Sequence, residues 1–94
     1  MEFERIVFSG HAVVRMFERS ITDVDVRHVL ETGEVIMRYS EDKPFPSCIV
    51  LGYVGDRVIH VVAALDDKNR TCHVITVYEP ELKRWQPDFR TRRK

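Results

Sequence analysis

The chain has 94 residues, the length of one domain with a small core, and its 15 Lys and Arg residues balance 15 Asp and Glu residues. The net charge of zero favours no class of partner. With 44% hydrophobic and 32% charged residues, no long apolar run and no basic-then-apolar start, the composition argues against a membrane span and a secretion signal. It predicts a cytoplasmic protein without a membrane partner.

The first strong pattern is an amphipathic helix within residues 8–21, with Ser9 as its predicted N-cap. Residues 2–8 before it fit either a short strand or an extended lead-in. A helical wheel separates a polar from an apolar side. The polar side holds His11, Arg15, Arg19 and Glu18. The apolar side holds Ala12, Val13, Met16 and Phe17. The helix N-terminus favours neutral His11, which can act as a base beside a bound anion. The alternative is an ordinary solvated helix face.

A second helix is predicted over Asp23–Thr32. Thr22 and Asp25 have the spacing of a capping box, and Gly33 is the expected left-handed stop. The residues expected to face inward are Val26, Val29 and Leu30. A short link joins the two helices, so we expect a helical hairpin or corner.

After Gly33 the apolar period changes from 3.6 to 2, which predicts strands. The predicted strands are Glu34–Tyr39, Ser47–Val54, Arg57–Leu65 and Thr71–Glu79. Gly55-Asp56 is the two-residue turn of a hairpin. We therefore expect one α+β domain over residues 1–94, with two N-terminal helices packed on a four-stranded antiparallel β-meander.

The loop lengths set an expected register for this sheet. His60 lies opposite Leu51 on one side and opposite Thr76 on the other. One face is then almost wholly apolar and carries the helices. The other face places Tyr53 and Tyr78 beside His60, and it is half open or covered by the C-terminal segment through Trp85 and Phe89.

The same register places Cys48 and Cys72 on opposite faces, so we expect two separate, buried and reduced thiols. No paired Cys or His spacing typical of zinc sites occurs. A glycine-rich phosphate loop and a nucleophile elbow are also missing from the sequence. The sequence therefore predicts no metal and no cofactor.

The remaining reactive side chains suit RNA cleavage without a metal ion, which needs a base, an acid and cations around the phosphate. His11 and His60 are the acid–base candidates. Arg15, Arg19 and Lys43 are the candidates for holding phosphate. The alternatives are a buried His60 bonded to Thr76, tyrosines that only pack, Trp85 as a core plug, and Arg38 and Arg84 as solvated charges.

Residues 81–94, the C-terminal segment, contain six basic and two acidic residues. Such a segment can hold a nucleic-acid backbone or an acidic partner, which makes Arg84 and Arg92 candidate substrate-binding residues. Because few apolar residues anchor Arg90 to Lys94, we expect this end to be mobile. A frayed, solvated end is the alternative.

Several motifs stand out along nearly the whole chain. They are Phe8-Ser9-x-His11-Ala12-x-x-Arg15-Met16-x-x-Arg19-x-Ile21, Gly33-Glu34-x-Ile36, Asp42-x-Pro44-x-Pro46-Ser47, His60-Val61-Val62-x-Ala64 and Thr76-Val77-Tyr78-Glu79-Pro80, up to Trp85. In combination they resemble a small bacterial family of domains of unknown function. Members of that family are often encoded beside zinc-finger antitoxins of the YgiT/MqsA type.

The resemblance extends to the barnase–EndoU–colicin–RelE class of metal-independent ribonucleases, which has two N-terminal helices and a four-stranded sheet. It implies a toxin of a type II toxin–antitoxin pair, an endoribonuclease similar to mRNA interferases. RNA and a cognate zinc-finger antitoxin are the implied partners. The implied residues of interest are His11, Arg15, Arg19, His60, Thr76 and Tyr78.

The predicted catalytic residues are His11, Arg15, His60, Thr76 and Tyr78, and the predicted substrate-binding residues are Arg19, Lys43, Arg84 and Arg92. Two other hypotheses stay open. The neutral overall charge, unlike that of many basic ribonuclease toxins, favours a non-catalytic protein- or nucleic-acid-binding module. A small structural or regulatory protein whose sheet edge accepts another chain is the third.

Overall fold

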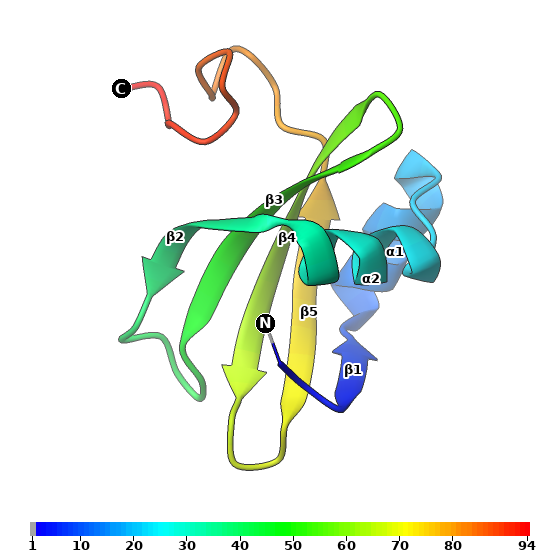
Figure 1. Cartoon of the computed structure of the whole chain (residues 1–94), viewed down its shortest axis with the longest axis vertical. Helices are drawn as coiled ribbons and strands as arrows, with labels where there is room; N and C mark the ends of the chain where they lie inside the picture. Colours follow the sequence, from blue (N-terminus) through cyan, green and yellow to red (C-terminus); the bar gives the residue numbers. More distant parts are fainter. Residues whose placement is uncertain (1) are drawn as a thin grey trace.

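The computed structural model describes residues 2–94 and shows a five-stranded sheet with two helices (Figure 1). The elements are β1 (Arg5–Phe8), α1 (Gly10–Arg19), α2 (Asp23–Thr32), β2 (Glu34–Tyr39), β3 (Ser47–Val54), β4 (Arg57–Asp66) and β5 (Thr71–Tyr78). The strand order is β1-β5-β4-β3-β2. No helix in this described range is long and apolar enough to cross a membrane.

The α+β class, both helices and the antiparallel β2–β5 meander are confirmed, but the expectation of four strands is wrong. Residues 2–8 contain β1, which pairs in parallel with β5, from Arg5 opposite Thr71 to Phe8 opposite Val74. The sheet is therefore mixed. A four-residue strand gives little periodic signal, and its partner is the strand most distant in sequence, so no local pattern reveals the pairing.

Both helix starts have the predicted caps. The hydroxyl of Ser9 accepts from the Ala12 backbone N–H at 3.0 Å, and Thr22 and Asp25 form the capping box. These bonds satisfy amides that have no partner inside the helix. The helix residues buried against the sheet are Ala12 of α1 and Val26, Val29 and Leu30 of α2.

Gly33 follows α2 as predicted, but the predicted left-handed stop is wrong. Its φ of −80° and ψ of 177° are extended backbone. A Cβ here would lie 2.5 Å from the carbonyl oxygens of both Leu51 and Val29. Glycine is therefore required by the close approach of the chain to β3, because any side chain would collide with these oxygens.

A β-bulge in the β4–β5 pair shifts the register between Val62 and Ala63. As a result His60 pairs with Tyr78, and Thr76 pairs with Val62. The predicted pairing of His60 with Thr76 is wrong, because the bulge and a turn shorter than expected both move β5 along β4. Thr76 still shares a face with Tyr78, since the two are separated by two residues in the strand.

The bulge also brings both cysteines onto the helix-bearing face. Cys48 and Cys72 are part of the same buried cluster, so the prediction of opposite faces is wrong. Both are free thiols. Burial raises the pKa of Cys72 to about 12. Burial also raises the pKa of Cys48, although the positive charge of nearby Arg38 acts to lower it. Both thiols are therefore protonated at neutral pH.

The C-terminal segment folds back against the upper end of the sheet in Figure 1. Trp85 is 3% exposed and forms an isolated bridge with Arg92. Arg90 pairs with Glu34 of β2 at 2.8 Å, and the Arg93 guanidinium donates to the Trp85 carbonyl at 3.0 Å. These basic side chains thus anchor the end of the chain, which was expected from the sequence to lack anchors because it has few apolar residues.

Candidate nucleic-acid interface

A cleft of about 580 Å³ lies between α1 and the C-terminal segment, and we call it the cationic cleft. Its basic side chains are Arg15 and Arg19 from α1 and Lys83, Arg84, Arg92, Arg93 and Lys94 from the C-terminal segment. Its acidic side chains are Glu79 and Glu81, and Tyr78 and Trp85 complete the lining. Seven basic groups thus meet two acidic ones in a chain with no net charge.

Most of this positive charge is not neutralised within the protein. Arg15 pairs with Glu18 at 3.6 Å, whereas the other six basic side chains of the cleft make no ion pair within residues 2–94. Glu79 pairs at 3.2 Å with Arg57, and Arg57 is not part of the lining of the cleft. The cationic cleft therefore presents a positive potential suited to a polyanion.

Arg57 also fixes the end of α1 that carries Arg19. Its guanidinium donates to the carbonyl oxygens of Arg19 at 2.7 Å and Ser20 at 3.0 Å. Carbonyls at a helix C-terminus have no partner inside the helix, so this side chain satisfies them and ties α1 to the start of β4. Sequence reasoning did not identify Arg57, because nothing in its local pattern links β4 to α1.

His60 is fully buried behind Tyr78 and Trp85. Its Nε2 lies 2.7 Å from the Phe89 carbonyl oxygen, which can only accept, so Nε2 carries the proton. Nδ1 of the neutral ring therefore accepts from the Tyr78 hydroxyl at 3.1 Å. The Trp85 ring meets His60 edge-on with centroids 4.5 Å apart. Trp85 and Phe89 thus cover this face of the sheet as expected.

The protonation states agree with these bond directions. Burial lowers the pKa of His60, against the raising effect of the Phe89 hydrogen bond, and nearby Arg92 lowers it further. Burial raises the pKa of Tyr78, while Arg92 opposes that shift. At neutral pH the site therefore holds a neutral imidazole and a protonated phenol.

We expect the free energy of unfolding to fall as the pH drops below about 6.5. Unfolded His60 takes up a proton near the ordinary pKa of 6.5, whereas burial keeps the folded residue neutral to lower pH. The unfolded state then binds more protons, so stability is lost through that window. Urea unfolding at about pH 7.5 and about pH 5.5 measures the effect. His60→Gln should reduce the pH dependence of the free energy of unfolding. His28→Gln, on the exposed side of α2, is the control and should leave it unchanged. The same pH dependence in both variants and the unaltered protein would contradict this role of His60.

The structure brings together five of the predicted site residues, which are Arg15, Arg19, Tyr78, Arg84 and Arg92. His11 is exposed on α1, one helical turn before Arg15 and outside the lining of the cleft. Thr76 also lies outside that lining. Lys43 is in the loop between β2 and β3, at the opposite end of the sheet from the C-terminal segment (Figure 1). Lys43 therefore does not line the cationic cleft.

The structure adds Lys83 to the cleft, together with Arg93 and Lys94 of the basic end, which was predicted to assist binding. The density of basic residues in the C-terminal segment was the available signal, but their closure onto α1 depends on tertiary packing. Across residues 2–94 no three His, Cys, Asp or Glu side chains group closely enough to hold a metal ion. The chemistry available in the cleft is phosphate binding by guanidinium groups and proton transfer at the Tyr78 hydroxyl.

No curated protein and no solved structure matches the chain. A family model described as a domain of unknown function, DUF4258, matches residues 8–79, from the end of β1 to just beyond β5. The matched region includes the α1 side of the cationic cleft and Tyr78, whereas the C-terminal segment lies beyond it. Since the model covers more than half of the chain, the protein belongs to the DUF4258 family of domains of unknown function.

Proposed function

We propose that this protein is the toxin of a type II toxin–antitoxin pair, a cytoplasmic endoribonuclease that cleaves RNA without a metal ion. The observation that carries the proposal is the cationic cleft, in which six of seven basic side chains have no ion pair within the described residues. Guanidinium groups hold phosphates through two parallel hydrogen bonds. The motif resemblance to ribonuclease toxins supports the same function.

In this reaction the ribose 2′-oxygen attacks the adjacent phosphorus and the bond from phosphorus to the 5′-oxygen breaks. One group accepts the 2′-hydroxyl proton and another protonates the leaving 5′-oxygen, so the products are a cyclic phosphate and a 5′-hydroxyl. Arg15 and Arg19 hold the phosphate and stabilise its charge. Tyr78, whose hydroxyl is protonated, is the acid. His11, exposed one turn from Arg15, is the base.

In this scheme His60 is a positioning residue for Tyr78. Both of its ring nitrogens are already hydrogen-bonded, and the ring is 0% exposed. It therefore cannot meet the substrate, but the hydrogen bond to its Nδ1 holds the Tyr78 side chain in place. In the reaction the Tyr78 hydroxyl rotates away from Nδ1 and gives its proton to the leaving 5′-oxygen. Thr76 has no role in the scheme, because it does not line the cationic cleft.

The direct test incubates the purified protein with single-stranded RNA in the presence of a chelator and analyses the ends of the products. We expect cleavage that leaves cyclic phosphate and 5′-hydroxyl ends. The matched control is DNA of the same sequence, which lacks the 2′-hydroxyl and should bind without being cleaved. Intact RNA, or products with 5′-phosphate ends, would contradict the proposed reaction.

Removing charge from the cleft should change the salt dependence of RNA binding. Each phosphate contact with a single strand contributes a slope of about −0.7 to log K against log salt concentration. Arg84→Gln combined with Lys94→Gln should therefore reduce the steepness by up to roughly 1.4. Lys43→Gln, at the other end of the sheet, is the matched control and should leave the slope unchanged. Fluorescence anisotropy at several salt concentrations measures the slope. An unaltered slope in the double variant would exclude Arg84 and Lys94 as phosphate contacts.

An exposed apolar stripe on α1 favours a second candidate function, protein binding. Val13 and Val14 are 53% and 55% exposed, and Phe17 is 87% exposed. Isolated exposed apolar residues are common, but three on one short helix form a surface that a partner can cover. The antitoxin proposed here, or another protein if the chain is a non-catalytic module, is the candidate occupant.

Phe17→Ser should weaken binding of the protein encoded by the neighbouring gene by about tenfold or more, because a large aromatic anchor is lost. The melting temperature and RNA binding should stay unchanged, since Phe17 is mostly exposed. Val24→Ser, at an exposed position on α2, is the control. Isothermal titration calorimetry measures the affinity. Equal affinity of the Phe17→Ser and unaltered proteins would show that α1 is not the contact.

A further inference from the structure

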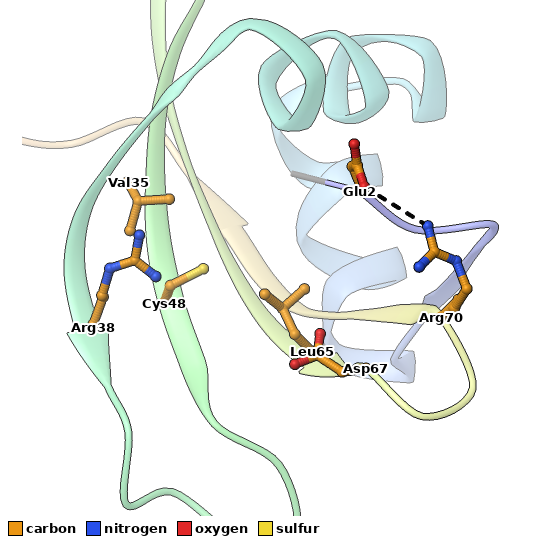
Figure 2. A pocket seen from close by; sticks show the side chains of 7 residues that line it. All are labelled: Glu2, Val35, Arg38, Cys48, Leu65, Asp67 and Arg70. Carbon is orange, nitrogen blue, oxygen red and sulfur yellow. Dashed lines mark ion pairs between the residues drawn. The ribbon is translucent and has the colours of Figure 1, made fainter.

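A second cavity, of about 510 Å³, shares no lining residue with the cationic cleft (Figure 2). Its apolar floor is made of Val35, Cys48 and Leu65 from three adjacent strands. Its charged rim consists of Glu2, Arg38, Asp67 and Arg70. This volume lies in the range of small-molecule sites, in which an apolar surface and a few polar groups act together.

The cavity exists because the helices are shorter than the sheet that they cover. Each helix has ten residues and is about 15 Å long, whereas the ten residues of β4 extend over roughly 33 Å. Figure 1 shows both helices beside one part of the sheet, with the lower part of β3 and β4 left uncovered by them. The core therefore ends in an apolar surface at half-buried Leu65, next to buried Cys48.

A β-bulge places a guanidinium group over this floor. The register of β2 against β3 shifts between Val35 and Met37, so Val35 opposes Val50 and Arg38 opposes Cys48. Residues three apart in a regular strand point to opposite faces, and the bulge instead puts Val35 and Arg38 on the same face. Figure 2 shows both side chains at the cavity beside Cys48.

The rim leaves one charge of each sign without a partner. Arg70 pairs with Glu4 at 3.4 Å and with Glu2 at 4.0 Å. Arg38 and Asp67 make no ion pair within the described residues. Arg38 comes from β2 and Asp67 from the turn that follows β4. Two strand spacings, or about 10 Å, separate β2 from β4.

We propose that this cavity binds a short apolar peptide with free ends, its carboxylate on Arg38 and its ammonium group on Asp67. Three extended residues span roughly 10 Å, which matches the separation of the two strands. The apolar side chains of the peptide would cover Val35, Cys48 and Leu65. The proposal is independent of RNA cleavage, since the two sites share no residue.

The test titrates the isotope-labelled protein with the tripeptide Leu-Ala-Leu and follows its NMR spectrum. We expect saturable shifts at Val35, Cys48 and Leu65. Arg38→Met should weaken the binding of the tripeptide and of its N-acetyl form by about tenfold, because a charge-assisted hydrogen bond to the carboxylate is lost. Binding of the C-terminal amide should stay unchanged. Asp67→Asn should weaken the binding of the tripeptide and of the C-terminal amide, and leave the binding of the N-acetyl form unchanged.

Matched control variants remove the same charges elsewhere. Arg27→Met on the exposed side of α2 and Asp56→Asn in the β3–β4 turn should change no affinity. Equal affinity of all three ligands, shifts away from the cavity, or no shift at all would overturn the proposal. RNA cleavage by the Arg38 and Asp67 variants should match that of the unaltered protein, so this result and the ribonuclease result can fail separately.

Discussion

Tyr78→Phe should lower the rate of RNA cleavage by about 10²–10⁴-fold, because it removes the proton that the leaving 5′-oxygen needs. RNA binding should persist, since the basic side chains of the cationic cleft are unchanged. The free energy of unfolding should fall by about 1–3 kcal/mol, because buried Nδ1 of His60 loses its donor. Single-turnover cleavage and urea unfolding measure the two effects. Tyr53→Phe, at a side chain 52% exposed, is the matched control.

His11→Ala extends the same prediction to the base. We expect a loss of about 10²–10⁴-fold in rate with the fold intact, because His11 is exposed on α1. Full activity of the folded variant would remove His11 from the reaction, and loss of folding would make it a structural residue. Full activity of Tyr78→Phe would likewise remove the phenol from the reaction, whatever the outcome for His11.

Trp85→Ala should lower the free energy of unfolding by about 3–5 kcal/mol, a large part of the total for a small domain. The indole is 3% exposed, packs edge-on against His60 and lies beneath the Arg92 guanidinium, 5.2 Å from the ring centroid. It therefore anchors the C-terminal segment to the sheet. Urea unfolding followed by circular dichroism measures the change.

Leu82→Ala is the matched control, because Leu82 belongs to the same segment and is 53% exposed. It should change stability by less than about 0.5 kcal/mol. RNA affinity of Trp85→Ala should also fall, since five basic residues of the cationic cleft depend on this anchor. A Trp85→Ala protein as stable as the Leu82→Ala protein would contradict the anchoring role.

Local patterns in the sequence predicted the elements well. The capping box at Thr22 and Asp25 is present, and Gly55-Asp56 forms the turn that pairs Val54 with Arg57. Such features depend on residues only a few positions apart, so a single sequence carries their signal. The register of β3 against β4 followed correctly from the same turn.

Features that depend on distant contacts were not predicted. The β5 bulge and the shorter β4–β5 turn together changed the partner of His60, and Cys72 lies on the other face from the one predicted, because each one-residue shift reverses the alternation. Nothing in the pattern of β5 marks the bulge. The same holds for β1, whose parallel pairing depends on a strand more than sixty residues away.

The site was predicted in two separate parts. Arg15 and Arg19 on α1, and Arg84 and Arg92 in the C-terminal segment, were each recognised as possible phosphate contacts from local charge. Their meeting in one cleft depends on the folding of residues 81–94 over the sheet. The burial of His60 beneath that segment changed its expected role, because burial follows from packing and not from the identity of the residue.

The most direct test of the cationic cleft as the RNA site is an NMR titration of the labelled protein with a short single-stranded RNA. A 2′-O-methyl RNA should be used, because it lacks the attacking hydroxyl and stays intact. We expect shifts confined to His11, Arg15, Arg19, Tyr78 and residues 83–94, with affinity that falls as salt rises. Shifts centred on the loop that holds Lys43, or no shift in the cleft, would contradict the account.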